Sequence, residues 1–178
     1  MPLKLQRTAA RMHAVRFLRY SMDTNKTQFN TSPIVVSTIG YEGRSCEGFI
    51  AELTGNEVQM VIDVRQRAGS RRRGFAKTAL ADMLTKAGID YIHLPQLGTP
   101  PELRTQLRDG DITRVTYLAK YRRYVKNQSA SFAELERLIA DQHCCLLCLE
   151  ASHRDCHRSC LASIIAERSV VPLVVRHL

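Results

Sequence analysis

Residues 58–64 read VQMVIDV, a mostly apolar and β-branched run that is interrupted by Gln59 and Asp63. Such a run predicts a strand that is buried on both faces. Similar short apolar runs occur at residues 34–39, 91–97, 144–149 and 170–175. We therefore expect five buried strands along the chain.

The segments between these runs carry helical patterns, because apolar residues recur there at spacings of three and four positions. The patterns cover residues 46–53, 76–87, 117–125, 132–139 and 160–165, and Ser45, Ser131 and Asp155 are expected to cap helices. Residues 102–112 are polar and give no clear assignment. Strands that alternate with helices predict an α/β fold. We expect a single three-layer domain with a mainly parallel five-stranded sheet and a Rossmann-like topology.

The chain has 178 residues, which is the length of one ordinary domain. It carries 26 Lys and Arg against 17 Asp and Glu, a net charge of +9. Residues 1–21 contain five basic residues and no acidic one, and Met22 follows as a candidate translation start. A targeting peptide or a basic arm is the alternative interpretation. We expect residues 1–31 to form a flexible basic extension and residues 32–178 to form the folded domain.

The cysteine content and the lack of a recognisable targeting signal indicate the cellular compartment of the protein. No apolar run approaches the roughly 20 residues of a membrane-spanning helix. The N-terminus also lacks the apolar segment and the cleavage site of a secretory signal. Six cysteines without such a signal indicate free thiols in a reducing compartment. We expect a cytoplasmic protein without a membrane partner, and the sequence gives no oligomeric state.

Polar residues gather where the predicted strands end. The carboxyl ends of parallel strands meet at one edge of the sheet, where ligands bind in open α/β folds. Asp63 interrupts an apolar run and needs a partner if it is buried as a carboxylate, and Arg65 leaves the strand on the same face. The residues expected to converge at this edge are Tyr41, Asp63, Arg65, His93, Glu150, Cys156, His157 and Arg158.

Short motifs follow the strand ends in a specific order. They are Thr38-Ile39-Gly40-Tyr41, Asp63-Val64-Arg65, Ser70-Arg71-Arg72, Gly74-Phe75, Tyr91-Ile92-His93-Leu94-Pro95, Leu97-Gly98-Thr99-Pro100, Cys148 with Glu150, and Cys156-His157-Arg158. Together they resemble the family catalogued as domain of unknown function 488, from about Ile34 to Arg168. The sequence departs from the family pattern at Ala68-Gly69. The resemblance implies a fold and a site at the strand ends, and it implies no established reaction.

Five of the six cysteines lie between residues 144 and 160, so we consider whether they form a metal site. A four-thiolate zinc site would use Cys145, Cys148, Cys156 and Cys160. Residues 145 and 148 lie on opposite faces of a strand, and Cys160 lies on the apolar face of its helix. The spacing therefore argues against a structural zinc, and we expect Cys145 and Cys160 to be buried and unreactive.

The predicted helix after the fourth strand begins with unusual residues. Cys156 lies at its N-terminus, where backbone amides stabilise a thiolate. His157 and Arg158 follow in the first turn, although the helix dipole disfavours positive charge there. They are expected either to pair with Glu150 and Asp63 or to hold an anionic ligand.

A basic loop follows the second strand at the same edge of the sheet. It contains Arg65, Arg67, Arg71, Arg72, Arg73 and Lys77. A basic run beside a ligand edge is a candidate for binding phosphate, in a nucleotide or in a nucleic-acid backbone. The sequence has neither a Walker loop nor a Gly-x-Gly-x-x-Gly motif, so no dinucleotide cofactor is expected.

Three functional interpretations follow, and we favour the first. The first is an enzyme that acts on a phosphate-bearing or nucleic-acid substrate. Its expected catalytic residues are Asp63, Glu150, Cys156, His157 and Arg158, of which Asp63, Glu150 and His157 would act as acids, bases or metal ligands. Its expected substrate-binding residues are Tyr41, Arg65, Arg71, Arg72 and His93. The alternatives are a non-enzymatic nucleic-acid-binding or regulatory module, and a cysteine-dependent enzyme with a loop from Cys148 to Arg154.

Overall fold

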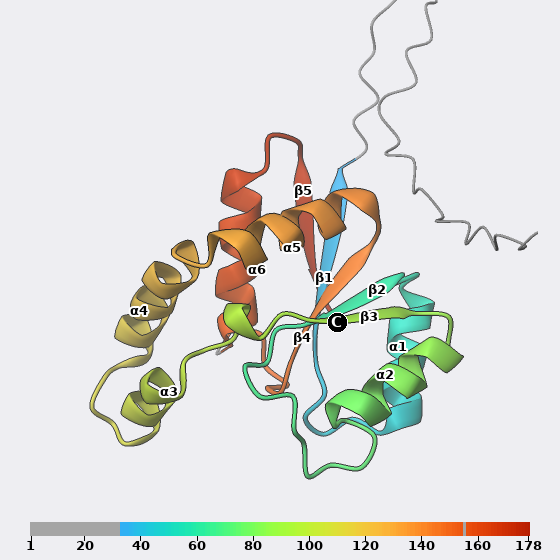
Figure 1. Cartoon of the computed structure of the whole chain (residues 1–178), viewed down its shortest axis with the longest axis horizontal. Helices are drawn as coiled ribbons and strands as arrows, with labels where there is room; N and C mark the ends of the chain where they lie inside the picture. Colours follow the sequence, from blue (N-terminus) through green and yellow to red (C-terminus); the bar gives the residue numbers. More distant parts are fainter. Residues whose placement is uncertain (1–32, 155) are drawn as a thin grey trace, which may run out of the picture. The chain divides into compact units, whose positions relative to one another are not determined.

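The computed structural model describes residues 33–154 and 156–178 (Figure 1). In this part of the chain, five strands form one parallel sheet in the order β3-β2-β4-β1-β5, which confirms the predicted α/β fold. The elements are β1 (Ile34–Gly40), α1 (Cys46–Gly55), β2 (Met60–Asp63), α2 (Lys77–Lys86), β3 (Asp90–His93), the 3-10 helix η1 (Pro95–Leu97), α3 (Pro101–Arg108), α4 (Arg114–Lys126), α5 (Ser129–Asp141), β4 (Cys144–Cys148), α6 (His157–Arg168) and β5 (Leu173–His177).

Helices cover both faces of the sheet and bury its apolar side chains. Figure 1 shows α1 and α2 together on one side of the sheet, and α4, α5 and α6 on the other. Successive residues of β4 point to opposite faces, so that Cys145 and Leu147 join the core under α1 and α2, whereas Cys144 and Leu146 join the core under α4, α5 and α6. Burial on both faces explains why the strand sequences are continuously apolar.

Short signals in the sequence set several helix ends. Ser45 caps α1, and its hydroxyl accepts a hydrogen bond from the amide of Gly48 at 3.0 Å. Gly88 follows α2 with a φ of 73°, a left-handed conformation that glycine adopts without strain. Asp155, the predicted cap of the last helix, lies outside the described residues. The N-cap of α6 is Cys156.

Several element boundaries differ from the predicted ones. The third strand ends at His93, and Pro95–Leu97 forms a 3-10 helix, because a proline has no N–H group for the sheet. Helix α5 begins at Ser129, before the predicted cap Ser131, and β5 is shifted to Leu173–His177. The unassigned polar stretch contains α3, which begins with a proline in its first turn.

The strand order places β4 between β2 and β1. The Rossmann fold of dinucleotide-binding proteins has the strand order 3-2-1-4-5-6, in which the first strand lies next to the second. The strand order of this sheet differs from that one. Because all five strands are parallel, their carboxyl ends still lie at one edge. The predicted flexible extension, residues 1–31, lies outside the described residues. No helix among the described residues is both long and apolar enough to cross a membrane.

Candidate active site

The loops that follow β1, β2, β3 and β4 approach one another closely at the carboxyl edge of the sheet. A Cβ atom built on Gly40 would lie 1.8 Å from the carbonyl oxygen of Glu150. One built on Gly98 would lie 2.3 Å from the amide nitrogen of Gln66. Neither space accommodates a side chain, since both neighbours are backbone atoms. Glycine at these two positions therefore allows the strand ends to form one compact edge.

Asp63 at the end of β2 is fully buried and forms an ion pair with Arg65, as the same-face spacing predicted. Its Oδ1 accepts hydrogen bonds from the backbone amide of Arg65 at 3.0 Å and from Nε at 2.8 Å. Its Oδ2 accepts from Nη2 of Arg65 at 2.6 Å and from the hydroxyl of Tyr91 at 2.7 Å. Burial lowers the pKa of Arg65, but Asp63 outweighs this effect and the net pKa lies above its ordinary value. Arg65 is therefore a fixed cation.

Arg65 also contacts two other predicted site residues. Its guanidinium carbon lies 5.1 Å from the ring centroid of Tyr41, and that ring stacks on Phe75 at 4.6 Å. Its Nη1 donates to the carbonyl of Phe75 at 2.9 Å. Nε2 of His93 lies 2.7 Å from the carbonyl oxygen of Arg65. Tyr41 and His93 thus help to fix the beginning of the loop after β2.

Two thiols, a carboxylate and an imidazole meet where β4 ends and α6 begins. Ligand-type atoms of Cys148, Glu150, Cys156 and His157 all lie within 4.8 Å of one another, and these four residues form the cysteine–histidine cluster. The thiols of Cys148 and Cys156 donate to Oε2 of Glu150 at 2.7 and 3.1 Å. Nδ1 of His157 lies 3.6 Å from Sγ of Cys148 and 3.8 Å from Sγ of Cys156.

The surroundings shift the pKa values of these groups in different directions. Burial and the hydrogen bond with Cys148 raise the pKa of Cys156, which opposes the thiolate predicted at this helix N-terminus. Burial also raises the pKa of Glu150, but the hydrogen bonds that it accepts outweigh burial and lower the net pKa. Burial lowers the pKa of His157, but its interactions with Cys156 and Glu150 outweigh burial and raise the net pKa. The ionised carboxylate of Glu150 and the protonated imidazole of His157 therefore stabilise each other.

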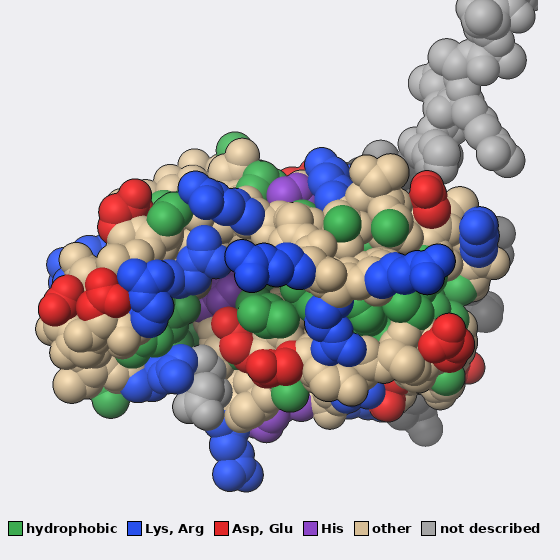
Figure 2. All heavy atoms as spheres, turned by 90° about the horizontal axis from the view of Figure 1, so that it is seen from below, with side chains coloured by type: hydrophobic (Ala, Val, Ile, Leu, Met, Phe, Trp, Pro, Cys, Tyr) green, Lys and Arg blue, Asp and Glu red, His purple; other side chains and the backbone are tan. Residues whose placement is uncertain are grey.

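A pocket of about 210 Å³ opens beside the cluster. Its lining consists of Tyr41, Arg65, Gln66, Arg67, Gly69, Thr99, Arg104, Cys148, Leu149, Glu150 and His157. Within residues 33–154 and 156–178, the guanidinium groups of Arg67 and Arg104 have no hydrogen-bond or ion-pair partner. The view from below in Figure 2 shows Lys and Arg side chains gathered across this face of the molecule, with acidic side chains between them.

Four of the predicted site residues, Tyr41, Arg65, Glu150 and His157, line this pocket. Arg158 instead has a fully buried side chain. Its Nη1 donates to the carbonyl of Glu150 at 2.5 Å and its Nη2 to the carbonyl of Ala151 at 3.0 Å. In the described part of the chain, these carbonyls take the place of the expected carboxylate partners. Arg158 therefore anchors the loop between β4 and α6.

Arg71 and Arg72 are exposed on the loop after β2 and lie outside the pocket lining. Arg72 is tied to the loop after β1, because its Nη1 donates to the carbonyl of Tyr41 at 2.9 Å and its Nη2 donates to the carbonyl of Arg44. It joins two loops of the site. A substrate-binding role for either arginine stays a prediction.

The remaining cysteines lie apart from the cysteine–histidine cluster. Cys145 is fully buried in the core under α1 and α2, on the face opposite Cys144, as the strand periodicity predicted. Burial raises the pKa of both thiols. Cys160 is only partly buried, which differs from the prediction, because it lies at the edge of the contact with α4, 4.0 Å from the carbonyl of Leu118.

Sequence reasoning missed three contributors to the site. Arg104 lies on α3, and a helix could have been recognised there from Pro101 in the first turn and the spacing of Leu103 and Leu107. Thr99 lies in a recognised motif, and its hydroxyl lies 2.9 Å from that of Tyr117. The hydroxyl of Tyr91 donates a hydrogen bond to the carboxylate of Asp63, and this contact depends on the pairing of β2 with β3.

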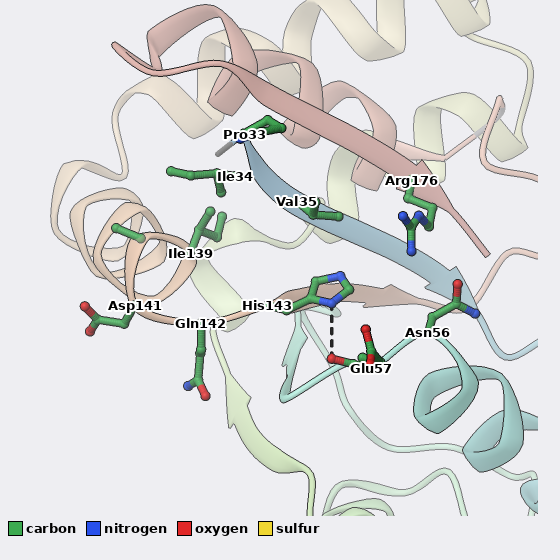
Figure 3. A pocket seen from close by; sticks show the side chains of 11 residues that line it. Pro33, Ile34, Val35, Asn56, Glu57, Ile139, Asp141, Gln142, His143 and Arg176 are labelled. Carbon is green, nitrogen blue, oxygen red and sulfur yellow. Dashed lines mark hydrogen bonds between the residues drawn. The ribbon is translucent and has the colours of Figure 1, made fainter. Parts of the chain in front are cut away.

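A second pocket, of about 350 Å³, is lined by the beginning of β1 and the residues before β4 (Figure 3). His143 lies in it and is held by two neighbours. Its Nε2 lies 2.9 Å from the hydroxyl of Ser37 and its Nδ1 lies 3.2 Å from the carbonyl of Glu57. Burial lowers the pKa of His143. Since both ring nitrogens are engaged by the fold, we assign the candidate site to the pocket at the strand ends.

Comparison with known proteins gives one match. The family model described as "Domain of unknown function DUF488" matches residues 45–165. This range includes Asp63, Arg65, His93 and the whole cysteine–histidine cluster. No curated protein and no solved structure matches the chain.

Proposed function

The chain belongs to the DUF488 family, whose name states no activity, and we propose from the site itself that it is an enzyme that acts on a phosphate-bearing substrate. One observation carries the proposal. The pocket at the strand ends combines Arg67 and Arg104, which have no hydrogen-bond or ion-pair partner among the described residues, with the side chains of Glu150, His157 and Cys148. Such a pocket offers both an anion-binding wall and groups that can transfer protons or bind a metal.

The charges of the pocket favour an anion with several oxygens. Arg65 is neutralised by Asp63, so the charge available to a ligand comes from Arg67 and Arg104, against the one carboxylate of Glu150. Guanidinium groups bind phosphate through two parallel hydrogen bonds, which a halide or a carbonyl group does not use as well. The guanidinium groups of Arg67 and Arg104 therefore suit a phosphate group better than a neutral ligand.

The size of the pocket limits what can enter. Its volume of about 210 Å³ is below the roughly 300–1,000 Å³ of a typical site for a drug-sized ligand. A phosphate group and the atoms next to it fit such a volume, and the rest of a larger substrate would lie outside. Arg71 and Arg73 on the loop after β2 are exposed and could contact that outer part, whereas Arg72 is held by the loop after β1.

The contacts give less support to the cysteine-dependent alternative. The thiol of Cys148 donates to Glu150 at 2.7 Å, and a thiolate in that position would be repelled by the carboxylate. Arg154, the last residue of the proposed cysteine loop, is exposed and lies outside the pocket lining. The basic face alone would also suit a nucleic-acid-binding module, which needs no carboxylate–imidazole pair such as Glu150 and His157.

Calorimetric titration of the full chain with inorganic phosphate tests the binding step. Arg104→Gln should weaken phosphate binding about tenfold, or about 1.4 kcal/mol, as expected for a hydrogen bond to a charged group. Arg108→Gln is the matched control, because Arg108 lies on the same helix but pairs with Asp109. Equal losses in both variants would indicate unspecific attraction to a basic surface and would contradict the proposal.

The catalytic step needs a separate measurement. Glu150→Gln should retain phosphate binding, since it removes a negative charge from the pocket, but it should lose turnover of p-nitrophenyl phosphate as a probe ester. Phosphate binding without turnover by the unaltered chain would instead support the binding-module alternative.

A further inference from the structure

We propose that the cysteine–histidine cluster, Cys148, Glu150, Cys156 and His157, binds a zinc ion at the pocket. Two sulfur atoms, one imidazole nitrogen and one carboxylate oxygen are a donor set that zinc prefers, whereas magnesium and calcium prefer oxygen alone. This inference deepens the proposed function, and it rests on that function only for the role of the ion toward a substrate.

The separations between the donor atoms suit a tetrahedral ion. Zinc bonds of about 2.0–2.3 Å place tetrahedral ligand atoms about 3.3–3.8 Å apart. Nδ1 of His157 already lies 3.6 Å from Sγ of Cys148 and 3.8 Å from Sγ of Cys156. The contacts of Glu150 with the two thiols are shorter, 2.7 and 3.1 Å, because each is a hydrogen bond. In a tetrahedral set these two contacts would lengthen to about 3.3–3.8 Å, which needs a shift of the carboxylate.

The neighbours of the cluster orient its donors as they do in known zinc sites. Nε2 of His157 lies 3.3 Å from the carbonyl oxygen of Val64. If Nε2 carries the proton, it donates to that carbonyl and leaves Nδ1 with the lone pair that an ion would bind, although Sγ of Cys148 lies nearly as close to Nε2, at 3.8 Å, as to Nδ1. A metal-binding histidine usually has such a partner on its other nitrogen. The ring of Tyr121 packs edge-on against the imidazole at 5.2 Å and limits its rotation.

Cys156 has a matching backbone contact. It is the N-cap of α6, and its sulfur accepts a hydrogen bond from the amide of Arg158 at 3.5 Å. Backbone amides that donate to a sulfur stabilise it as a metal-bound thiolate. The capping role also helps the experiment, because serine is a favoured N-cap residue and Cys156→Ser should preserve the helix.

The position of the cluster gives the ion access to a ligand. Cys148, Glu150 and His157 line the pocket, whereas Cys156 is buried next to them. An ion held by these residues would lie beside the pocket that Arg67 and Arg104 also line. A metal in that place can polarise a phosphate oxygen or activate a bound water, which the arginines cannot do.

Metal content of the full chain tests the inference directly. Under a thiol reductant, the purified chain is stripped of metal, reloaded with zinc and analysed by mass spectrometry for metal per chain. We expect one zinc per chain for the unaltered protein and for Cys160→Ser, whose cysteine lies outside the cluster. Cys156→Ser should bind zinc about 100-fold more weakly or worse. Cobalt should give thiolate charge-transfer absorption that weakens in Cys156→Ser, which keeps the thiolate of Cys148, and that is unchanged in Cys160→Ser.

Three results would overturn the metal site. They are the absence of stoichiometric zinc in the folded chain, equal zinc loss in Cys156→Ser and Cys160→Ser, and a cobalt spectrum without thiolate bands. Circular dichroism of Cys156→Ser verifies that the variant is folded, and Glu150→Gln, at a partly buried position, serves as a second ligand variant. The phosphate titration with Arg104→Gln is independent of this assay. Zinc binding without phosphate binding would therefore leave the metal site intact and contradict the proposed function alone.

Discussion

Replacement of Asp63 by asparagine should destabilise the protein strongly, because Asp63 neutralises a cation that the fold encloses. The carboxylate has no exposed surface, and the side chain of Arg65 is 6% exposed. Arg65 donates three hydrogen bonds to the two carboxylate oxygens, and Tyr91 donates a fourth. Asp63→Asn removes the charge and turns one acceptor into a donor that faces other donors.

The expected loss of stability follows from the burial of the ion pair between Asp63 and Arg65. Loss of one partner of a buried ion pair costs about 3–5 kcal/mol, because the other charge remains buried without compensation. In a chain of this size each kcal/mol lowers Tm by about 2–4 °C, so Tm should fall by about 6–20 °C. Since whole domains are stable by about 5–15 kcal/mol, this loss is a large part of the total.

Urea unfolding followed by far-ultraviolet circular dichroism measures the effect. Asp82→Asn is the control, because Asp82 is an exposed carboxylate on α2 and should change stability by at most about 0.5 kcal/mol. The double variant Asp63→Asn with Arg65→Met should cost less than the two single variants together, since no charge is left uncompensated. An Asp63→Asn variant as stable as Asp82→Asn would refute the reasoning.

Two further predictions concern the loops and the second pocket. Gly40→Ala should cost at least about 2 kcal/mol, because its Cβ would lie 1.8 Å from a backbone oxygen, whereas Gly55→Ala meets nothing within 4 Å and should be neutral or slightly stabilising in thermal unfolding. Burial lowers the pKa of His143 below its ordinary value of 6.5, so the unfolded chain takes up its proton first and stability should fall as pH drops through that range. His143→Gln should reduce this fall when urea midpoints at about pH 8 and about pH 5.5 are compared, and an unchanged fall would contradict the assignment.

Much of the fold was predictable because it depends on local patterns. Five apolar runs separated by helical periodicities require a parallel sheet that is covered on both faces, and a parallel sheet brings its strand ends to one edge. The pairing of Asp63 with Arg65 was also predictable, since residues two positions apart on an extended chain point to the same side. These inferences needed no knowledge of which strands are neighbours.

The rest of the site depends on strand register and on the paths of loops. Tyr91 reaches Asp63 because β2 and β3 pair with Val61 opposite Tyr91 and Asp63 opposite His93, and no single strand sequence contains this pairing. Arg104 reaches the pocket because α3 follows a proline-rich turn, in a segment whose polar composition hid its helix. The pocket wall could therefore not be assembled from the strand ends alone.

The first turn of α6 holds two residues whose positive charge is unusual at a helix N-terminus, and each is stabilised in a different way. His157 and Arg158 place positive charge at the end of a helix where the dipole opposes it. Arg158 is stabilised there by two backbone carbonyls, because the loop after β4 passes over it, and its role is to hold that loop. His157 is stabilised by Glu150 and the two thiols, which are the donors that we propose for the zinc ion. The sequence marks the helix start as unusual, and only the path of the loop after β4 shows that Arg158 anchors that loop while His157 belongs to the cysteine–histidine cluster.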